Sequence, residues 1–306
     1  MANIQTWKVS EPYIQMKCGL GEAPFYETNT GCLRFVDIVK EKLHIVDLKT
    51  GPSSLQSFDL GTPVSTSADI EGNEDEIIVG AKYGYALMNR KTKKLEYIKK
   101  VWERSDGEGK DERMRFNDGI VDPLGRYWAG TMNDPKVHEP SPEGILFRLD
   151  PDLSLHRMIE GVTIPNGMGF SLYGGTMYFI DSPTSSVSKF KYDDATGEIS
   201  DRQTFYEVEG EGVPDGLAMD EKGCLWIAVC GGGKVLRVDP DGELVGVIEM
   251  PTRMVSCPAF AGEDLYVTSA EEEEPDKYPE SVEFGGSLFK VHVGVGVLPL
   301  HKFKRK

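Results

Sequence analysis

The chain has 306 residues, of which 39% are hydrophobic, which is enough for one large core or two domains. Its 34 glycines and 18 prolines are typical of a turn-rich β protein rather than a helical one. The formal net charge of −16 argues against binding to a nucleic-acid backbone, which requires concentrated lysine and arginine, but it is compatible with a metal cation or a neutral solute.

The cysteine content predicts reduced thiols. The number of cysteines is odd, and no C-x-x-C pair occurs among Cys18, Cys32, Cys224, Cys230 and Cys257. The first 18 residues lack the apolar segment of a signal peptide. No run approaches the roughly 18 apolar residues of a membrane span. We therefore expect a cytoplasmic protein that binds neither nucleic acid nor membrane.

Strand-like runs recur along the chain, each preceded by turn residues. In chain order they cover residues 32–37, 76–80, 126–132, 176–181, 224–229 and 264–269. A further strand-like run follows most of them, at 43–47, 145–150, 187–193, 234–239 and 287–291. The repeat length is about 40 to 50 residues, which is typical of four-stranded propeller blades.

This repetition predicts an all-β fold, a six-bladed β-propeller with a central channel. Helical periodicity is absent over any long window, and no linker interrupts the repeats. The six repeats fill the chain, so we expect residues 1–306 to form a single domain. A ring of blades must close on itself, and we expect the N-terminal segment around Trp7 to Ile14 to complete the last blade.

Four of the repeats carry an oxygen-bearing side chain about 11 to 13 residues before the centre of the strand-like run. These residues are Glu22, Asn117, Asn166 and Asp215. Because equivalent positions in a closed ring face one axis, the four side chains should converge at one mouth of the channel. Asn-Gly and Asp-Gly are also common hairpin turns. Their occurrence in register across four repeats favours a shared site.

The chemistry of these four side chains indicates a metal ion. Two carboxylates placed together repel each other, and a bound cation removes that repulsion. Ligands that are all oxygen favour Ca²⁺, Mg²⁺ or Mn²⁺ over a zinc site made of histidine and cysteine. Arg115 stands two residues before Asn117, so both would share one face of a strand, where the arginine could hold a polar substrate. A surface salt bridge is the alternative for Arg115.

Other catalytic patterns are missing from the sequence. There is no G-x-S-x-G, no P-loop, no G-x-G-x-x-G and no complete EF-hand loop. The five histidines have no ligand spacing, so we expect them to be surface or strand residues. The acidic run Glu271 to Glu274 is expected to be a solvated loop, with a lid near the channel mouth as the alternative.

The chain resembles the senescence marker protein/gluconolactonase/luciferin-regenerating enzyme family, also called regucalcin-like proteins, over nearly its whole length. The words that carry the resemblance are Gly21-Glu22-Ala23-Pro24, Arg115-Phe116-Asn117-Asp118-Gly119, Gly130-Thr131-Met132, Asn166-Gly167, Asp181-Ser182 and Pro214-Asp215-Gly216. The resemblance implies one divalent ion in the channel, held by Glu22, Asn166 and Asp215. It also implies that Asn117 and Arg115 contact substrate or a metal-bound water.

The resemblance implies hydrolysis of sugar lactones and a cytoplasmic monomer or weak oligomer whose partner is a small sugar lactone. Ca²⁺ is the expected ion, with Zn²⁺, Mg²⁺ or Mn²⁺ as alternatives. Many relatives carry acidic sugar contacts after the Gly-Thr-Met word, whereas this chain has Asn133-Asp134-Pro135. We expect Asp134 to replace them as a substrate contact.

We therefore expect metal-assisted lactone hydrolysis in which Asp215 takes a proton from the attacking water, or metal-bound hydroxide attacks directly. Three alternatives remain: hydrolysis of a phosphotriester or nitrile at the same ion, a calcium-binding regulator without catalysis, and a scaffold propeller of the WD40 or kelch kind. The G-H…W-D signature of the scaffold class is missing.

Overall fold

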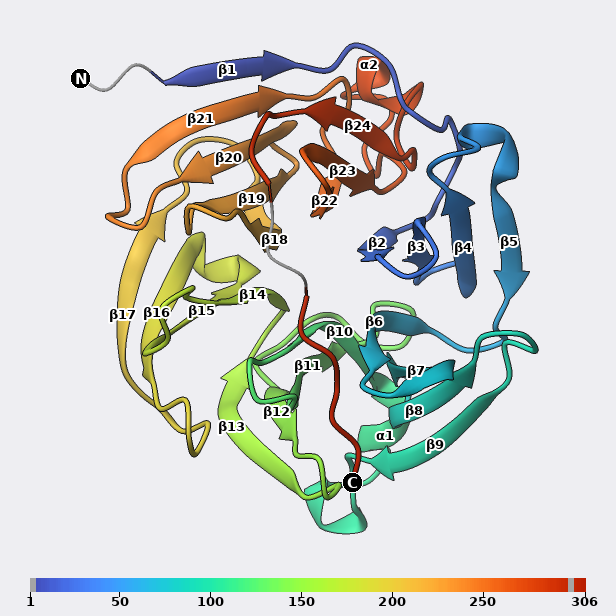
Figure 1. Cartoon of the computed structure of the whole chain (residues 1–306), viewed down its shortest axis with the longest axis vertical. Helices are drawn as coiled ribbons and strands as arrows, with labels where there is room; N and C mark the ends of the chain where they lie inside the picture. The colour runs from blue at the N-terminus through green and yellow to red at the C-terminus, as the bar shows by residue number, and fades with distance from the viewer. Residues whose placement is uncertain (1–3, 297–299) are drawn as a thin grey trace.

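The computed structural model describes residues 4–296 and 300–306, and in these residues six small sheets are arranged around a central axis (Figure 1). Each sheet is a blade whose strands run outward from the axis in chain order. Within the blades, neighbouring strands pair antiparallel, apart from one added strand described below. The all-β, six-bladed propeller predicted from the repeats is confirmed.

The blades follow one another along the chain and have these bounds. Blade one has β2 (Gly21–Glu27), β3 (Cys32–Asp37), β4 (Lys42–Asp47) and β5 (Gln56–Asp59); blade two has β6 (Val64–Ile70), β7 (Asn73–Ala81), β8 (Gly84–Asn89) and β9 (Leu95–Lys100); blade three has β10 (Met114–Val121), β11 (Tyr127–Asn133), β12 (Gly144–Leu149) and β13 (Leu155–Val162). Blade four has β14 (Pro165–Phe170), β15 (Thr176–Asp181), β16 (Ser186–Tyr192) and β17 (Ile199–Glu207); blade five has β18 (Val213–Met219), β19 (Leu225–Cys230), β20 (Lys234–Val238) and β21 (Leu244–Glu249); blade six has β22 (Val255–Ala261), β23 (Asp264–Ser269) and β24 (Phe289–His292). Short helices lie in the connections: α1 (Lys110–Arg113), α2 (Pro279–Val282), and 3₁₀ turns at Pro52–Ser54, Arg104–Asp106 and Ser182–Thr184.

The second strand of a blade is buried on both faces because neighbouring blades pack against it on either side. All seven residues of β11 are buried, as are the first five of β19. Between blades two and three the core contains a cluster of aromatic rings from Tyr85, Phe116, Tyr127 and Phe147. Because both faces of these strands are buried, the strands are continuous apolar runs in the sequence.

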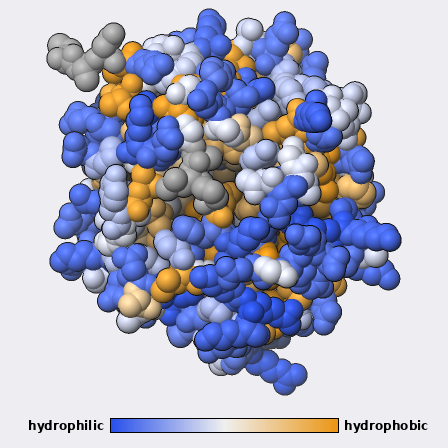
Figure 2. Space-filling view, in the orientation of Figure 1, coloured by the Kyte–Doolittle hydropathy of each residue, from blue (hydrophilic) through white to orange (hydrophobic). Residues whose placement is uncertain are grey.

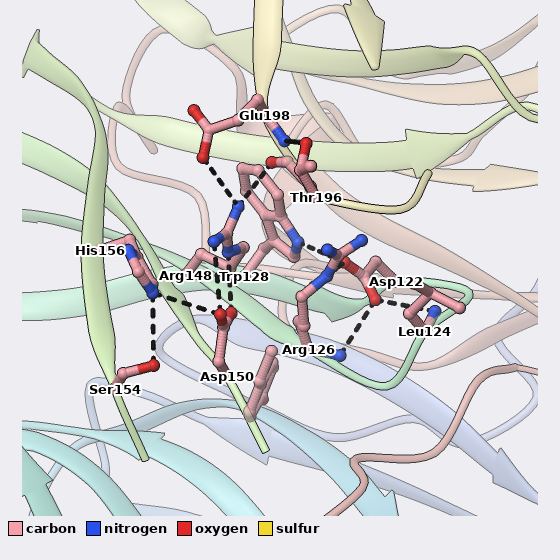
Figure 3. Close-up of polar contacts among 12 residues, drawn as sticks. Asp122, Leu124, Arg126, Trp128, Arg148, Asp150, Ser154, His156, Thr196 and Glu198 are labelled. Carbon is pink, nitrogen blue, oxygen red and sulfur yellow. Dashed lines mark hydrogen bonds and ion pairs between the residues drawn. The ribbon is translucent and has the colours of Figure 1, made fainter. Parts of the chain in front are cut away.

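A buried polar network fixes the hairpin between the first two strands of blade three (Figure 3). Asp122 is fully buried and accepts hydrogen bonds from the indole of Trp128 at 3.0 Å and from the hydroxyl of Tyr192 at 2.8 Å. It also accepts from the side chain and the backbone N–H of Arg126. The Asp-Pro-Leu-Gly turn is thereby joined to the apolar strand that follows it and to blade four.

The N-terminal segment runs along blades five and six before it enters blade one. β1 (Gln5–Lys8) pairs in parallel with β21 of blade five, where Trp7 packs on Trp226 with ring centroids 5.3 Å apart. Ile14 pairs with Leu288 at blade six. The segment from Trp7 to Ile14 therefore pairs with blade five at its start and with the three-stranded blade six at its end, whereas we expected the whole segment to complete the last blade.

The C-terminal residues 300–306 run across the channel end to blades two and three (Figure 1). Phe303 pairs with Ile70 and its side chain is fully buried. At this end, beside Leu300, the channel widens into a cavity of about 340 Å³ lined mainly by apolar side chains of the inner strands. Figure 2 shows hydrophobic side chains gathered in the central hollow, within a mostly hydrophilic rim. Among the described residues, no helix has the length and apolar character needed to cross a membrane.

Candidate functional site

Four of the predicted site residues, Glu22, Asn117, Asn166 and Asp215, lie on the innermost strands at β-bulges. The pairing of inner and second strands shifts register between Glu22 and Phe25, between Phe116 and Gly119, between Pro165 and Met168, and between Pro214 and Leu217. A bulge inserts an extra residue and re-aims the local side chains. The repeated words of the sequence are therefore bulges rather than hairpin turns, and they occur at the same level of each blade.

Glycine follows two of these positions because neighbouring inner strands approach closely there. A Cβ atom on Gly167 would lie 2.8 Å from the carbonyl oxygen of Asp215, and one on Gly216 would lie 2.5 Å from the sulfur of Cys257. Side chains at these positions would push the inner strands apart. The Asn-Gly and Asp-Gly words thus combine a bulge with close packing around the axis.

Three carboxylates converge where these bulges meet: Glu22 of β2, Asp118 of β10 and Asp215 of β18. Burial raises the pKa of Glu22 well above its ordinary value, and the nearby Asp215 and Asp118 carboxylates raise it further. Burial and then Asp118 raise the pKa of Asp215. Burial also raises the pKa of Asp118, to about 6. Glu22 and Asp215 are buried and Asp118 is half-buried, and a bound cation would relieve the repulsion among these three acids.

A chain of hydrogen bonds joins the amides of the site across three blades. Arg115 donates to Asn117 Oδ1 at 2.8 Å, and Asn117 Nδ2 donates to Asn166 Oδ1 at 3.0 Å. Asn166 Nδ2 donates to Ser182 Oγ at 2.8 Å, and Ser182 donates to the carbonyl oxygen of Pro214. The chain fixes both amide groups, and it carries the network from blade three through blade four to the strand that bears Asp215.

The donor set fits a hard divalent cation. The residues around the axis offer carboxylate and amide oxygens, which suit Ca²⁺, Mg²⁺ or Mn²⁺. The charge of Arg115 lowers the pKa of Glu22, against the effects of burial, Asp215 and Asp118. Burial lowers the pKa of Arg115 itself to about 10, so its guanidinium remains charged at neutral pH. The charge of Arg115 does not balance those of Glu22, Asp118 and Asp215, so a divalent ion could neutralise the remainder.

Residues 20–271 match the family model described as the SMP-30/Gluconolactonase/LRE-like region. The chain belongs to the SMP-30/gluconolactonase/LRE-like family. The match spans the inner strands that carry Glu22, Asn117, Asn166 and Asp215. The resemblance inferred from the sequence words is thereby confirmed.

Members of the SMP-30/gluconolactonase/LRE-like family resemble this chain over nearly its full length. YvrE, a candidate sugar lactone lactonase of Bacillus subtilis, is 32% identical over 282 residues, covering 90% of this chain and 92% of YvrE. Regucalcin of Oryctolagus cuniculus is 36% identical over 289 residues, covering 92% of each chain. The solved structure of regucalcin from Agrobacterium tumefaciens, a calcium-binding protein, matches with a TM-score of 0.87 and 25% identity over 99% of this chain and all of that one.

The structure adds Asp118 to the site residues predicted from the sequence. In a regular strand, neighbouring side chains point to opposite faces, so Asn117 and Asp118 should not both reach the axis. The bulge between Phe116 and Gly119 removes that alternation. The Asn-Asp-Gly word was visible in the sequence, but the bulge that turns both side chains inward was not.

Asp134 lies near Arg115, but its carboxylate is already engaged. Its Oδ2 accepts from Lys82 at 2.8 Å, and its Oδ1 accepts from the backbone N–H of Lys136 at 3.2 Å. The Lys82 hydrogen bond keeps the pKa of Asp134 low against the effect of burial, which is the largest single influence and acts in the opposite direction. Lys82, from the turn between β7 and β8 of blade two, is a further polar group beside the site that the sequence patterns did not reveal. A sugar contact from Asp134 remains a prediction.

We expected the acidic run Glu271 to Glu274 to be a solvated loop, but one of its four side chains is buried. The Glu272 side chain is 1% exposed and pairs with Arg253. The charge of Glu273 contributes to the raised pKa of Cys230, after burial, Asp215 and Glu22. Asp215 and Glu22 also act on Cys230, so the charge of Glu273 reaches the surroundings of the channel carboxylates. That the loop is a lid stays a prediction.

Proposed function

We propose that this chain is a divalent-cation-dependent hydrolase that opens sugar lactones to aldonic acids. Glu22, Asn166 and Asp215 would hold the cation, and Arg115, Asn117 and Asp134 would bind the substrate. The observation that carries the proposal is the proximity of two buried carboxylates and one half-buried carboxylate, whose charges act on one another, to a charged arginine and two hydrogen-bonded amides.

The bound cation would polarise the lactone carbonyl and lower the pKa of water at the site. The reaction adds water to the carbonyl carbon, breaks the bond between that carbon and the ring oxygen, and yields a carboxylic acid and an alcohol. Asp215 accepts the proton from the attacking water. Without an ion, burial and Asp118 raise the pKa of Asp215, so a bound cation would be needed to keep this carboxylate ionised and able to accept a proton.

Substrate hydroxyls require fixed hydrogen-bonding groups on one side of the reacting carbonyl. Arg115 is held by the carbonyl oxygen of Phe116 and by Asn117, so its remaining N–H groups keep a set direction. Asn117 is held in turn by its bonds to Pro165 and Asn166. Lys82 and Asp134 form a second polar pair near this arginine. Such prearranged donors position a substrate without loss of side-chain entropy on binding.

The relatives support the lactone as substrate. The family description includes gluconolactonase, and YvrE carries the name of a sugar lactone lactonase. The Agrobacterium tumefaciens regucalcin, a calcium-binding protein, supports a divalent ion, with Ca²⁺ as the first choice and Zn²⁺, Mg²⁺ or Mn²⁺ as alternatives. Localisation in the cytoplasm is part of the same proposal.

Acid release from a panel of aldonolactones, measured on the Ca²⁺-loaded full chain, tests the proposal. Asp215→Asn should lower kcat at least about 100-fold, because loss of a positioned base typically costs 10²- to 10⁴-fold. Asp241→Asn, an equal charge change in an exposed turn, should leave the rate unchanged. Organophosphates and nitriles belong in the same panel.

Each contrary outcome identifies one of the alternatives. Turnover of a phosphotriester or nitrile in place of lactones would assign another hydrolase activity to the same site. Tight Ca²⁺ binding without turnover of any substrate would assign a regulator. Full activity of Asp215→Asn would remove this residue from the mechanism.

A further inference from the structure

Three potential metal ligands lie together in blade one, outside the channel site. Cys18 precedes β2, Asp37 ends β3 and His44 lies in β4, and all three are buried. One ligand atom from each residue lies within 4.8 Å of the others. The sulfur of Cys18 is 3.8 Å from Nε2 of His44. Thiol, imidazole and carboxylate groups in this proximity are the ligand types of a zinc site.

His44 is oriented as metal-binding histidines are. Its Nδ1 lies 2.8 Å from the hydroxyl of Ser57, which can accept the Nδ1 proton. The ring stacks on Phe35 with centroids 4.9 Å apart, so its plane is fixed. With the proton on Nδ1, the lone pair of Nε2 faces Cys18. A hydrogen bond from the second ring nitrogen is the usual support of a metal-bound imidazole.

Asp37 is fixed by the backbone and retains room for an ion. Its two oxygens accept three N–H groups, from Gly19 at 2.8 Å, Leu20 at 3.2 Å and Lys40 at 3.0 Å. A carboxylate has about four lone-pair sites, so one is left. The same bonds hold the backbone beside Cys18, which keeps the thiol next to this carboxylate.

The charges around the cluster allow a divalent ion. Lys40 and Lys42 are nearby cations; Glu271 pairs with Lys40 at 3.1 Å, and Asp59 pairs with Lys42 at 2.7 Å. The backbone N–H of Glu271 also donates to the carbonyl oxygen of Cys18. Burial, followed by the charge of Asp37, raises the pKa of the Cys18 thiol, so the thiol is neutral when no ion is bound.

We propose that Cys18, Asp37 and His44 form a second metal site, selective for Zn²⁺ or Cd²⁺ over Ca²⁺. As the metal–sulfur bond forms, the thiol proton leaves to solvent, with no oxidation or reduction. Tetrahedral zinc ligands lie roughly 3.3 to 3.7 Å apart at ordinary bond lengths, so the cluster needs to contract by about 1 Å. A soft ion here would not compete with a hard ion in the channel.

This site differs in chemistry and position from the channel site, and it does not depend on the proposed hydrolysis. It joins the segment before β2 to β3 and β4. Glu22 stands four residues after Cys18, at the start of β2. A bound ion would therefore clamp the segment that leads into the first carboxylate of the channel.

Cadmium titration of the chelator-treated full chain, in the presence of excess Ca²⁺, tests the site. We expect one equivalent of Cd²⁺ to bind with a thiolate-to-cadmium absorption band and the release of a proton. Cys18→Ser should abolish the band, and His44→Gln should weaken Cd²⁺ binding at least tenfold by calorimetry. Cys32→Ser, a half-buried cysteine in the adjoining strand, is the matched control and should behave as the unaltered chain does.

Two further variants separate this cluster from the channel, where Cys230 and Cys257 lie near the carboxylates. The band should persist in Cys230→Ser and in Asp215→Asn. Loss of the band in Cys230→Ser, its persistence in Cys18→Ser, or its absence from the unaltered chain would overturn the proposal. Circular dichroism of each variant checks folding, and His44→Gln provides an independent result if Cys18→Ser does not fold.

Discussion

In blades three and five, a fully buried aspartate follows the first strand: Asp122 in blade three and Asp220 in blade five. Asp220 accepts from the indole of Trp226 at 3.0 Å and from Arg237 at 2.7 Å, as well as from two backbone N–H groups of its own turn. Asp122 holds Trp128 in the same way. In both blades the tryptophan follows the aspartate by six residues, so the same local network joins a turn to the most buried strand.

Asp220→Ala should lower the free energy of unfolding by about 3 to 5 kcal/mol. The substitution leaves Arg237 nearly buried without its carboxylate, and removal of one partner of a buried ion pair typically costs this much. Urea unfolding followed by tryptophan fluorescence measures the change. Asp241→Ala, in an exposed turn of the same blade, should change stability by no more than about 0.5 kcal/mol. A loss below about 1 kcal/mol for Asp220→Ala would contradict this account.

At the scale of elements, one glutamate holds the short helix near the channel mouth. Glu143 precedes β12 and accepts hydrogen bonds from Arg113 at 2.8 Å and Lys110 at 3.0 Å, both from α1. The carbonyl oxygen of Arg113 accepts from the backbone N–H of Asp134. The helix is thereby joined to the loop that carries a predicted substrate contact.

These bonds give Glu143 a pH-dependent contribution to stability. The Arg113 hydrogen bond, followed by that of Lys110, lowers the pKa of Glu143 from 4.5 to about 2. The unfolded chain therefore takes up this proton first, and the contribution is present above about pH 4.5 and lost as the pH falls toward 2. Glu143→Gln should be less stable than the unaltered chain at pH 7, with a difference that shrinks below pH 4.5 in urea unfolding. A difference that stays constant from pH 7 to pH 3 would refute the assignment.

The sequence revealed those elements that are buried on two faces. Runs such as Leu225–Cys230 are apolar throughout, and their even spacing predicted the six blades. Outer strands such as β17 are largely exposed and lack a continuous apolar run, so the patterns did not reveal them. We assigned Trp7 to the last blade, whereas it packs on blade five. An apolar side chain in this segment indicates that it covers the edge of a sheet, but it does not indicate which sheet.

The sequence repeats predicted four residues of the candidate site. Glu22, Asn117, Asn166 and Asp215 occupy equivalent places, and the structure sets them on equivalent bulges. The place of Asp118 in the site depends on the bulge between Phe116 and Gly119. The alternation of side chains along a regular strand does not predict such a bulge. The cluster of Cys18, Asp37 and His44 comes from three segments with no recognisable ligand spacing, so only the folded blade brings it together.

At the scale of the whole molecule, the negative charge on the axis opposes the closure of the ring. Glu22, Asp118 and Asp215 come from blades one, three and five, so their repulsion pushes apart strands that the blades hold together. The first and last blades are joined by the pairing of Leu20 with Ala270 and by the hydrogen bond from Ser256 to the carbonyl oxygen of Gly21. A cation bound between the carboxylates would connect nonadjacent blades through the centre.

Metal removal should therefore destabilise the entire propeller, not the site alone. Ca²⁺ at 100 times its dissociation constant should add about 2.7 kcal/mol to the free energy of unfolding, through binding to the folded state only. Asp118→Asn should stabilise the chelated protein but weaken the stabilisation by Ca²⁺. It should raise the melting temperature of the chelated protein, because one of three repelling charges is gone, and reduce the increase produced by Ca²⁺. Calorimetric melting with chelator and with excess Ca²⁺ measures both effects. Equal melting temperatures with and without Ca²⁺, or a lower melting temperature of chelated Asp118→Asn, would show that these carboxylates do not repel across the ring.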